Sequence, residues 1–278
     1  MFKKTFVLLA ILGFASLALA QVEQKIQGAG MIDWNDQSVT STGVGALNPK
    51  LPPSAQRKNA LRAAQLDAMR NMVETLNGVL LTSETTVENA MMSSDIIKTR
   101  VDGIVKNFRF TSKPRYMSDG SVEVDMEMLL TGKVGDVLYP EQMGGKTPTY
   151  ANLPSSNDAI FIADAETGLI IDATLTDAQP AMVPTVLDES GEGIYGQDFV
   201  PRESAVKNGV VVYAKSMEEA RANAARVGSN PLVIKAVKSS GLNKADLIIA
   251  DSDVENVAVI ADNTDIYDNC RVIIVLKQ

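Results

Sequence analysis

An alternation of apolar and acidic residues over positions 121–130 is the clearest hydrophobic pattern in the chain. Every second residue is apolar and the residues between are acidic, in the order Val122, Glu123, Val124, Asp125, Met126, Glu127 and Met128. A period of two predicts a β-strand with one buried face and one face in solvent. Ser118, Asp119 and Gly120 precede it as a turn signal, so residues 108–117 are predicted to form the other strand of a hairpin.

A longer pattern with helical spacing covers residues 55–77. Apolar residues recur there at steps of three or four: Leu61, Ala64, Ala68 and Met72. This spacing predicts one buried helix face, and Gly78 is a typical helix stop. A second helix is predicted over residues 96–105, after a cap at Ser94. Residues 79–87, between the two helices, are rich in β-branched side chains and predict a strand.

The N-terminal part of the chain adds two further strands. Residues 22–34 and 38–46 are the candidates, separated by a turn at Asn35 and Asp36. With the elements above, they predict an α+β module over residues 21–138, in which antiparallel strands are covered by two helices.

A stretch rich in Pro, Gly and Ser, residues 139–158, is predicted to be a linker. Beyond it, residues 159–278 alternate short apolar runs with helical patterns, which predicts a second, mixed α/β module. Its predicted strands are residues 169–171, 183–187, 210–213, 232–237, 247–250 and 271–276. Its predicted helices, residues 216–228 and 252–263, begin with capping boxes.

Residues 1–20 have the pattern of a secretory signal peptide. Lys3 and Lys4 precede a short apolar run that ends in small residues at Ala18 and Ala20. We expect cleavage near Ala20 and Gln21, which leaves a mature chain in the periplasm or secreted. An uncleaved membrane anchor is the alternative, but a bilayer span needs about 20 apolar residues and this run is shorter.

Two further expectations concern the membrane. A lipidated N-terminus needs a cysteine directly after the cut, and the chain has one cysteine, Cys270. No other segment is apolar over a spanning length, so no transmembrane helix is expected in the mature chain. Peripheral association with the outer membrane remains compatible with this sequence.

Composition narrows the classes of function. Without residues 1–20 the chain has 24 basic and 34 acidic residues, a formal net charge of −10, which argues against a nucleic-acid partner because phosphate binding needs clustered Lys and Arg. The chain has no histidine, which removes the usual Ser-His-Asp and Cys-His catalytic arrangements. Cys270 precedes an apolar run and is predicted to be buried as a small hydrophobic residue.

We assign no catalytic, cofactor-binding or metal-binding residue from the sequence, and we expect no cofactor. The weak metal candidates are Asp262, Asp265 and Asp268, whose oxygen density is typical of a calcium loop. A solvated loop is the favoured interpretation, because the glycine and glutamate positions of an EF-hand are missing. The twelve methionines suit Cu(I) in principle. Met69, Met72, Met126 and Met128 fall on predicted apolar faces, so core packing explains the methionines better.

Several segments together resemble a known family. They are residues 63–72 with Gly78 and Val79, residues 94–103, and the hairpin at Asp119 and Gly120. This pattern is similar to the LPP-type (twenty-kilodalton) outer-membrane lipoprotein family, which includes the flagellar protein FlgP, and to the N-terminal domain of the flagellar protein FlgT. The resemblance covers the N-terminal module only. It implies a small α+β module of the bacterial cell envelope, often built into ring or disc assemblies, with no catalytic residue.

The chain departs from that family by lacking the lipidated cysteine and by adding a second module. We therefore expect an exported cell-envelope protein that is not an enzyme and acts as a structural or assembly module. The outer membrane and the flagellar basal body are its candidate locations. Its expected partners are further copies of itself or other envelope proteins, with Phe108, Phe110 and Tyr116 as candidate contact points.

Two other classes of function stay open. One is a periplasmic module that binds a small ligand or a cation in the second module. The other is a hydrolase with paired carboxylates, which would need two acids with perturbed pKa values in one cleft.

Overall fold

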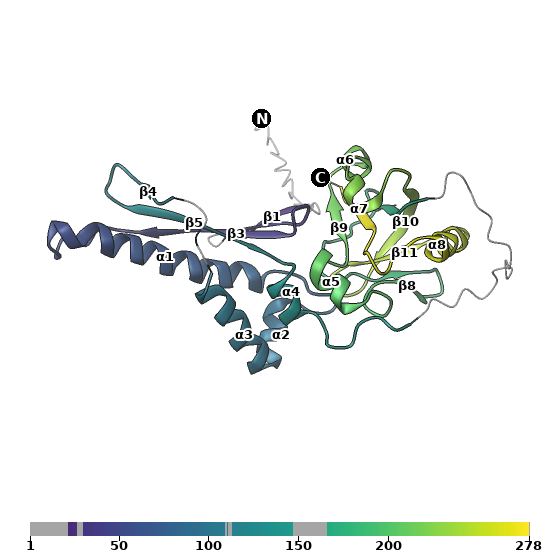
Figure 1. Cartoon of the computed structure of the whole chain (residues 1–278), viewed down its shortest axis with the longest axis horizontal. Helices are drawn as coiled ribbons and strands as arrows, with labels where there is room; N and C mark the ends of the chain where they lie inside the picture. Colours follow the sequence, from purple (N-terminus) through teal and green to yellow (C-terminus); the bar gives the residue numbers. More distant parts are fainter. Residues whose placement is uncertain (1–21, 27–29, 109, 111–112, 147–165, 278) are drawn as a thin grey trace, which may run out of the picture.

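The computed structural model describes residues 22–26, 30–108, 110, 113–146 and 166–277. The protein is α+β, and two modules lie side by side along its long axis (Figure 1). The N-terminal module contains a five-stranded antiparallel sheet, and the C-terminal module contains a seven-stranded mixed sheet. The predicted fold class is therefore confirmed. The predicted signal peptide, residues 1–20, lies outside the described residues.

The first sheet has the strand order β1-β2-β3-β5-β4. The strands are β1 (Glu23–Ile26), β2 (Gly30–Asp33), β3 (Ser38–Gly45), β5 (Val122–Leu129) and β4 (Arg115–Tyr116). The alternation predicted for β5 is present, because its four even-numbered residues are buried and its acidic residues lie on the other face. Two predictions of extent were wrong. Residues 22–34 form two strands instead of one, and only Arg115–Tyr116 of residues 108–117 is a strand.

Helix α1 (Pro53–Asn77) lies along β3 at unusually short range. A Cβ atom on Gly43 would lie 2.1 Å from the carbonyl oxygen of Ala64, and one on Gly45 would lie 1.9 Å from that of Ala60. Alanine on the helix and glycine on the strand let the two backbones touch. Ala64, Ala68 and Met72 of the predicted face are therefore fully buried, whereas Leu61 is only half-buried.

The segment after α1 differs from its prediction. Residues 79–87 do not form a strand, since their only ladder contact is an isolated bridge between Leu80 and Thr86. The side chain of Thr86 then caps α2 (Val87–Ser93), and that of Ser94 caps α3 (Asp95–Lys106). Helices α1 and α3 were predicted, whereas α2 and the short α4 (Lys133–Leu138) were not.

The second sheet has the order β8-β7-β11-β10-β6-β12-β9. Its strands are β6 (Leu169–Asp172), β7 (Val186–Leu187), β8 (Gly193–Tyr195), β9 (Val212–Ala214), β10 (Leu232–Ser240), β11 (Asp246–Ile249) and β12 (Val272–Val275). Strand β6 pairs in parallel with both β10 and β12. Its alternate side chains enter two different apolar clusters, so the middle of the sheet is buried on both faces.

The described residues of this module form four helices: α5 (Arg202–Asn208), α6 (Met217–Ala222), α7 (Ala224–Val227) and α8 (Asp251–Asn263). The helix predicted over residues 216–228 is interrupted at Asn223, which ends α6 and caps α7 with its side chain. Helix α5 and strand β8 are short and were not predicted.

The predicted linker is described only in part. Residues 139–146 pack on the second module, where the backbone N–H of Gly144 donates to the carbonyl of Gln197 at 2.8 Å. The rest of that linker and the first residues of the second module, 147–165, lie outside the described residues. Over the residues that are described, no helix has both the length and the apolar character that a membrane crossing requires.

Candidate functional site

Among the described residues, backbone and side-chain hydrogen bonds join the two modules at a junction. The loop after α1 enters a slot in the second module, where Leu80 and Leu81 accept backbone hydrogen bonds from Met182 and Val183 at 2.9 and 2.8 Å. Backbone pairing of this kind resembles the addition of a strand to a sheet edge. The residues predicted to be a strand in the first module thus bind the second one.

Ser83 is the centre of this loop. Its hydroxyl donates to the carboxylate of Asp246, whose other oxygen accepts the backbone N–H of Thr185 at 2.8 Å. The carbonyl of Ser83 accepts from the backbone N–H of Asn243, also at 2.8 Å. Gly241 completes the slot, because a Cβ atom there would lie 2.4 Å from the Cβ of Ser83.

An aromatic contact also joins the two modules at the junction. Trp34, in the turn between β2 and β3, meets the edge of Tyr213 on β9 with ring centroids 5.8 Å apart. Both rings are buried, and the Tyr213 hydroxyl is satisfied by the backbone of Ala181. Lys215 and Glu23 form an ion pair across the same boundary.

A buried arginine lies just behind the junction. Arg226 on α7 is 9% exposed, and its guanidinium donates to the carbonyls of Asn208, Gly209 and Val210 at 2.6 to 3.1 Å. Burial lowers the pKa of Arg226. The Asn208 carbonyl also accepts the side-chain amide of Gln37 from the first module. One carbonyl therefore joins the core of the second module to the first.

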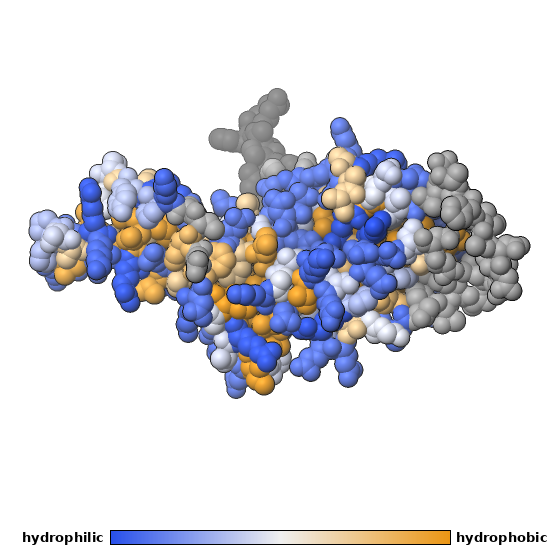
Figure 2. Space-filling view, viewed as in Figure 1, coloured by the Kyte–Doolittle hydropathy of each residue, from blue (hydrophilic) through white to orange (hydrophobic). Residues whose placement is uncertain are grey.

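A groove opens beside the junction on the first module. It has a volume of about 760 Å³ and lies between α3, the end of β5 and α4. Its apolar lining residues include Ile104, Phe108, Leu129 and Val137, while Arg100 and Lys133 bring positive charge. Apolar side chains gather over this part of the molecule (Figure 2). No sequence pattern predicted the groove, because its lining residues come from separate segments of the chain.

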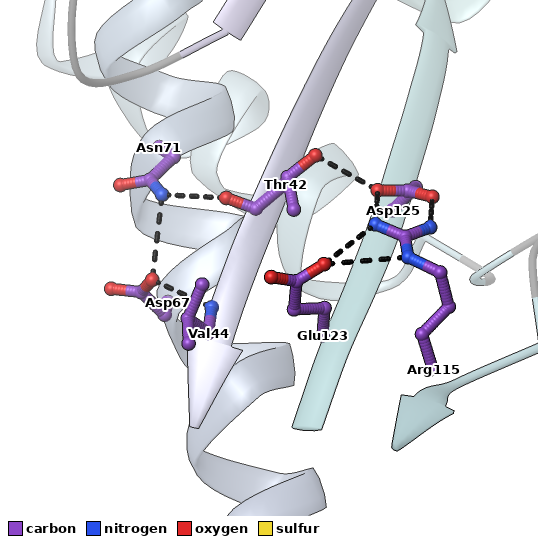
Figure 3. Close-up of polar contacts among 7 residues, drawn as sticks. All are labelled: Thr42, Val44, Asp67, Asn71, Arg115, Glu123 and Asp125. Carbon is purple, nitrogen blue, oxygen red and sulfur yellow. Dashed lines mark hydrogen bonds and ion pairs between the residues drawn. The ribbon is translucent and has the colours of Figure 1, made fainter. Parts of the chain in front are cut away.

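Polar side chains of α1 form hydrogen bonds with backbone groups at the edge of β3 (Figure 3). Strand β2 pairs with β3 only as far as Ser41. Beyond that point α1 takes the place of a neighbouring strand: Asp67 accepts the backbone N–H of Val44 at 3.0 Å, and Asn71 donates to the carbonyl of Thr42 at 2.8 Å. The hydrogen bond from Val44 is the main cause that lowers the pKa of Asp67.

The same figure shows Arg115 of β4 over the acidic face of β5. Arg115 pairs with both Glu123 and Asp125, and Thr42 donates to Asp125 at 2.8 Å. The hydrogen bond from Arg115 is the main cause that lowers the pKa of Asp125. These acids are therefore bound to a cation of their own sheet, and we assign them a structural role.

The structure places two of the three weak metal candidates in the loop before β12. Asp265 and Asp268 are exposed, and Asp265 accepts a hydrogen bond from Asn269 at 3.3 Å. The side chain of Asp262, in the last turn of α8, lies outside the described residues. No three acidic or cysteine side chains gather in a metal-binding arrangement within the described ranges.

Cys270 and the aromatic contact candidates can also be placed. Cys270 is buried as predicted, and burial raises the pKa of its thiol to about 11. Phe108 and Phe110 are half-buried, whereas Tyr116 is 57% exposed. Of the methionines, Met72, Met126 and Met128 are in the core, while Met92 is exposed at the end of α2.

Comparison with known proteins gives one match to a protein family. Residues 168–278 are similar to the second domain of Treponema pallidum Tp0624. The match begins at the start of β6 and covers the whole described part of the second sheet. No curated protein matches the chain.

Proposed function

We propose that the chain is an exported, non-catalytic protein of the bacterial cell envelope, which assembles with copies of itself or with another envelope component. The leader over residues 1–20 and the resemblance of the N-terminal module to LPP-type lipoproteins support this proposal. The match to a domain of another bacterial protein is compatible with a second module that is reused in different chains.

The junction is the observation that carries the proposal. Backbone hydrogen bonds at Leu80, Leu81 and Ser83, with the packing of Trp34 on Tyr213, fix the two modules to one another. Assembly subunits need surfaces that keep their relative directions, and a fixed junction supplies this property. A protein that works by closing two modules around a ligand would need a looser connection.

Fractionation of a host that expresses the full chain with a C-terminal tag tests the proposal. We expect the tagged protein in the envelope fraction, with Gln21 or a near neighbour as its first residue. After mild cross-linking, we expect bands larger than one chain. Full-length protein that stays inside the cell, or exported protein that forms no cross-linked species, would contradict the proposal.

The groove supports a second candidate function, binding of a small apolar ligand. Its volume of about 760 Å³ lies within the range of about 300–1,000 Å³ that is common for ligand pockets. Titration with an environment-sensitive apolar dye tests this candidate. Binding that is lost in Leu129→Arg, and kept when the exposed Leu175 is changed to Arg, would favour it over the assembly proposal.

A further inference from the structure

The first turns of helix α1 lie far from the junction of the two modules. Helix α1 ends at Asn77, shortly before Leu80 and Leu81 of the junction. Its 25 residues span about 37 Å at a rise of 1.5 Å per residue. Its first turns therefore lie at the end of the first module that is remote from the second module, as Figure 1 shows.

This remote end is positively charged, and we refer to it as the basic tip. It comprises residues 53–62 of α1 and the hairpin between β4 and β5. Arg57, Lys58 and Arg62 are exposed and have no ion-pair partner among the described residues, and residues 53–62 contain no acid. The hairpin adds one acid, Asp119, which is held by Ser121.

The basic tip also has an apolar component. Arg57 lies 5.6 Å from the ring centroid of Tyr116, and both Tyr116 and its neighbour Met117 are exposed. Strongly hydrophilic side chains project from α1 at this end with apolar ones between them (Figure 2). Arginine and tyrosine are enriched in protein interfaces, so this composition suits a protein contact.

The second module carries the opposite charge. Residues 166–278 contain ten basic and 17 acidic residues, a formal net charge of −7. Part of this negative charge can be located by following strand β11 away from the junction. It begins at Asp246, which contacts Ser83 of the junction, and Asp251 follows its other end, about 16 Å farther away at 3.3 Å per residue.

Several acids meet at that distant side, which we refer to as the acidic end. It comprises Asp188, Glu189 and Glu192 in the turn between β7 and β8, with Asp251 at the start of α8. Glu189 and Asp251 accept hydrogen bonds from each other's backbone N–H at 3.4 and 3.1 Å, so the turn and the helix are held together. None of these four carboxylates has an ion-pair partner in the described part of the chain.

The positions of the basic tip and the acidic end determine which contact between two copies is electrostatically favourable. They lie on opposite sides of the junction, so the basic tip cannot reach the acidic end of its own chain. A contact of tip with tip, or of acidic end with acidic end, would bring like charges together and is disfavoured. A contact between the tip of one copy and the acidic end of another is complementary, and such a head-to-tail contact builds a ring or a filament.

We infer that the basic tip docks on the acidic end of a second copy of this chain. This inference rests on the proposed function, because it names the partner and the surfaces of the assembly. Two opposed charge patches in place of a large apolar interface make the contact sensitive to salt, since the Debye length falls from about 10 Å at 0.1 M to about 3 Å at 1 M.

Sedimentation velocity of the mature chain, with two charge-reversed variants, tests the inference. Lys58→Glu with Arg62→Glu reverses the net charge of the tip. Glu189→Lys with Glu192→Lys brings the net charge of the acidic end to zero, because Asp188 and Asp251 remain. The unchanged chain is expected to self-associate, with an affinity that falls at least about tenfold between 0.05 and 0.5 M salt. Each variant alone is expected to sediment as a single chain, because its tip and its acidic end no longer carry opposite net charges.

An equimolar mixture of the two variants is expected to restore association in pairs, because the unchanged tip of one variant meets the unchanged acidic end of the other. The matched controls change the same amount of charge elsewhere: Lys207→Glu with Arg221→Glu, and Glu203→Lys with Glu218→Lys. Both controls are expected to associate like the unchanged chain. Thermal unfolding followed by circular dichroism verifies that every variant is folded.

The outcomes separate this inference from the proposed function. Self-association that ignores salt and both reversals would overturn the head-to-tail contact and leave the assembly function standing. A mature chain that never associates and cross-links to no envelope protein would overturn both. Binding of the unchanged chain to vesicles of anionic phospholipid, lost on reversal of the tip in a chain that stays single, would assign the tip to a lipid surface and overturn the inference.

Discussion

Arg226 illustrates at the residue scale how a buried charge fixes a loop of this protein. Its guanidinium is buried, and its donors are used on backbone carbonyls of the loop before β9. The loop would otherwise place several carbonyls inside the protein without donors, which costs free energy. The arginine therefore fixes the same loop that Gln37 of the first module contacts.

Substitution of Arg226 tests this role. Arg226→Met keeps much of the side-chain volume but removes every donor, so at least three buried carbonyls lose a partner. We predict a loss of about 2–4 kcal/mol in the free energy of unfolding, measured by urea titration of the mature chain. Arg221→Met, at an exposed position on α6, is the control and is expected to change stability little. Equal stability of the two variants would contradict the assigned role.

Asp67 gives a prediction of pH dependence. Its pKa is lowered in the folded protein, chiefly by the hydrogen bond from Val44. A carboxyl with a depressed pKa stabilises the folded state above its unfolded pKa of about 3.9, and this contribution is lost as the pH falls through the folded value. Asp67→Ala is therefore predicted to cost about 1 kcal/mol at pH 7, with the difference from the unchanged chain shrinking toward pH 3.

Urea titrations at pH 7, 5, 4 and 3 measure this difference. Asp36→Ala, in the turn before β3, is the comparison variant for a surface acid. A cost for Asp67→Ala that is the same at every pH would show that the carboxylate charge has no part in holding the strand edge.

At the element scale, the contact between α1 and β3 is set by residue size. A Cβ atom on Gly43 would lie 2.1 Å from both the Ala64 carbonyl oxygen and the Ala68 nitrogen, and backbone atoms cannot move aside independently. We predict that Gly43→Ala separates the helix from the strand and costs roughly 3 kcal/mol or more. The midpoint of urea unfolding is the measurement.

Gly103 on α3 provides the opposite case. No heavy atom lies within 4 Å of a Cβ built there, so Gly103→Ala is predicted to stabilise the protein by about 0.5–1 kcal/mol through helix propensity. If both glycine variants lose stability, steric contact with α1 is not what distinguishes Gly43.

The regular elements were predictable because each has a local period or cap. The alternation in β5, the spacing of alanines in α1 and the capping Ser94 are properties of one segment, and the structure confirms all three. The failures occur where distant residues decide. Residues 79–87 have strand-like composition, but several of their backbone hydrogen bonds join residues about 100 to 160 positions away.

The candidate sites were less accessible to prediction than the elements. Ser83 and Asp246 have no sequence pattern that connects them, because their meeting depends on how the two modules dock. The groove likewise depends on the relative placement of α3, β5 and α4. Burial of Cys270 was predictable, since an apolar strand follows it directly.

At the scale of the whole molecule, the junction determines whether the two modules unfold together. Ser83→Ala removes the hydroxyl bonded to Asp246 and is predicted to cost about 1–2 kcal/mol. Asp246→Asn keeps the shape but removes the charge. A double-mutant cycle of the two is predicted to give a coupling energy of at least about 0.5 kcal/mol.

Calorimetry of these variants gives a second measure of the junction. A single transition in the unchanged chain that separates into two in the double variant is the expected result. Ser229→Ala, an exposed serine of the second module, is the control. Zero coupling energy would mean that Ser83 and Asp246 contribute to stability independently and do not fasten the modules to each other.

The native mass of the mature chain, measured by sedimentation equilibrium over a wide concentration range at low salt, tests most directly the claim that this protein acts by assembling through its surfaces. We predict a weight-average mass that rises with concentration above that of one chain and falls again when salt is added. A mass that stays at one chain over the whole range, in a protein that also captures no envelope component, would contradict the claim.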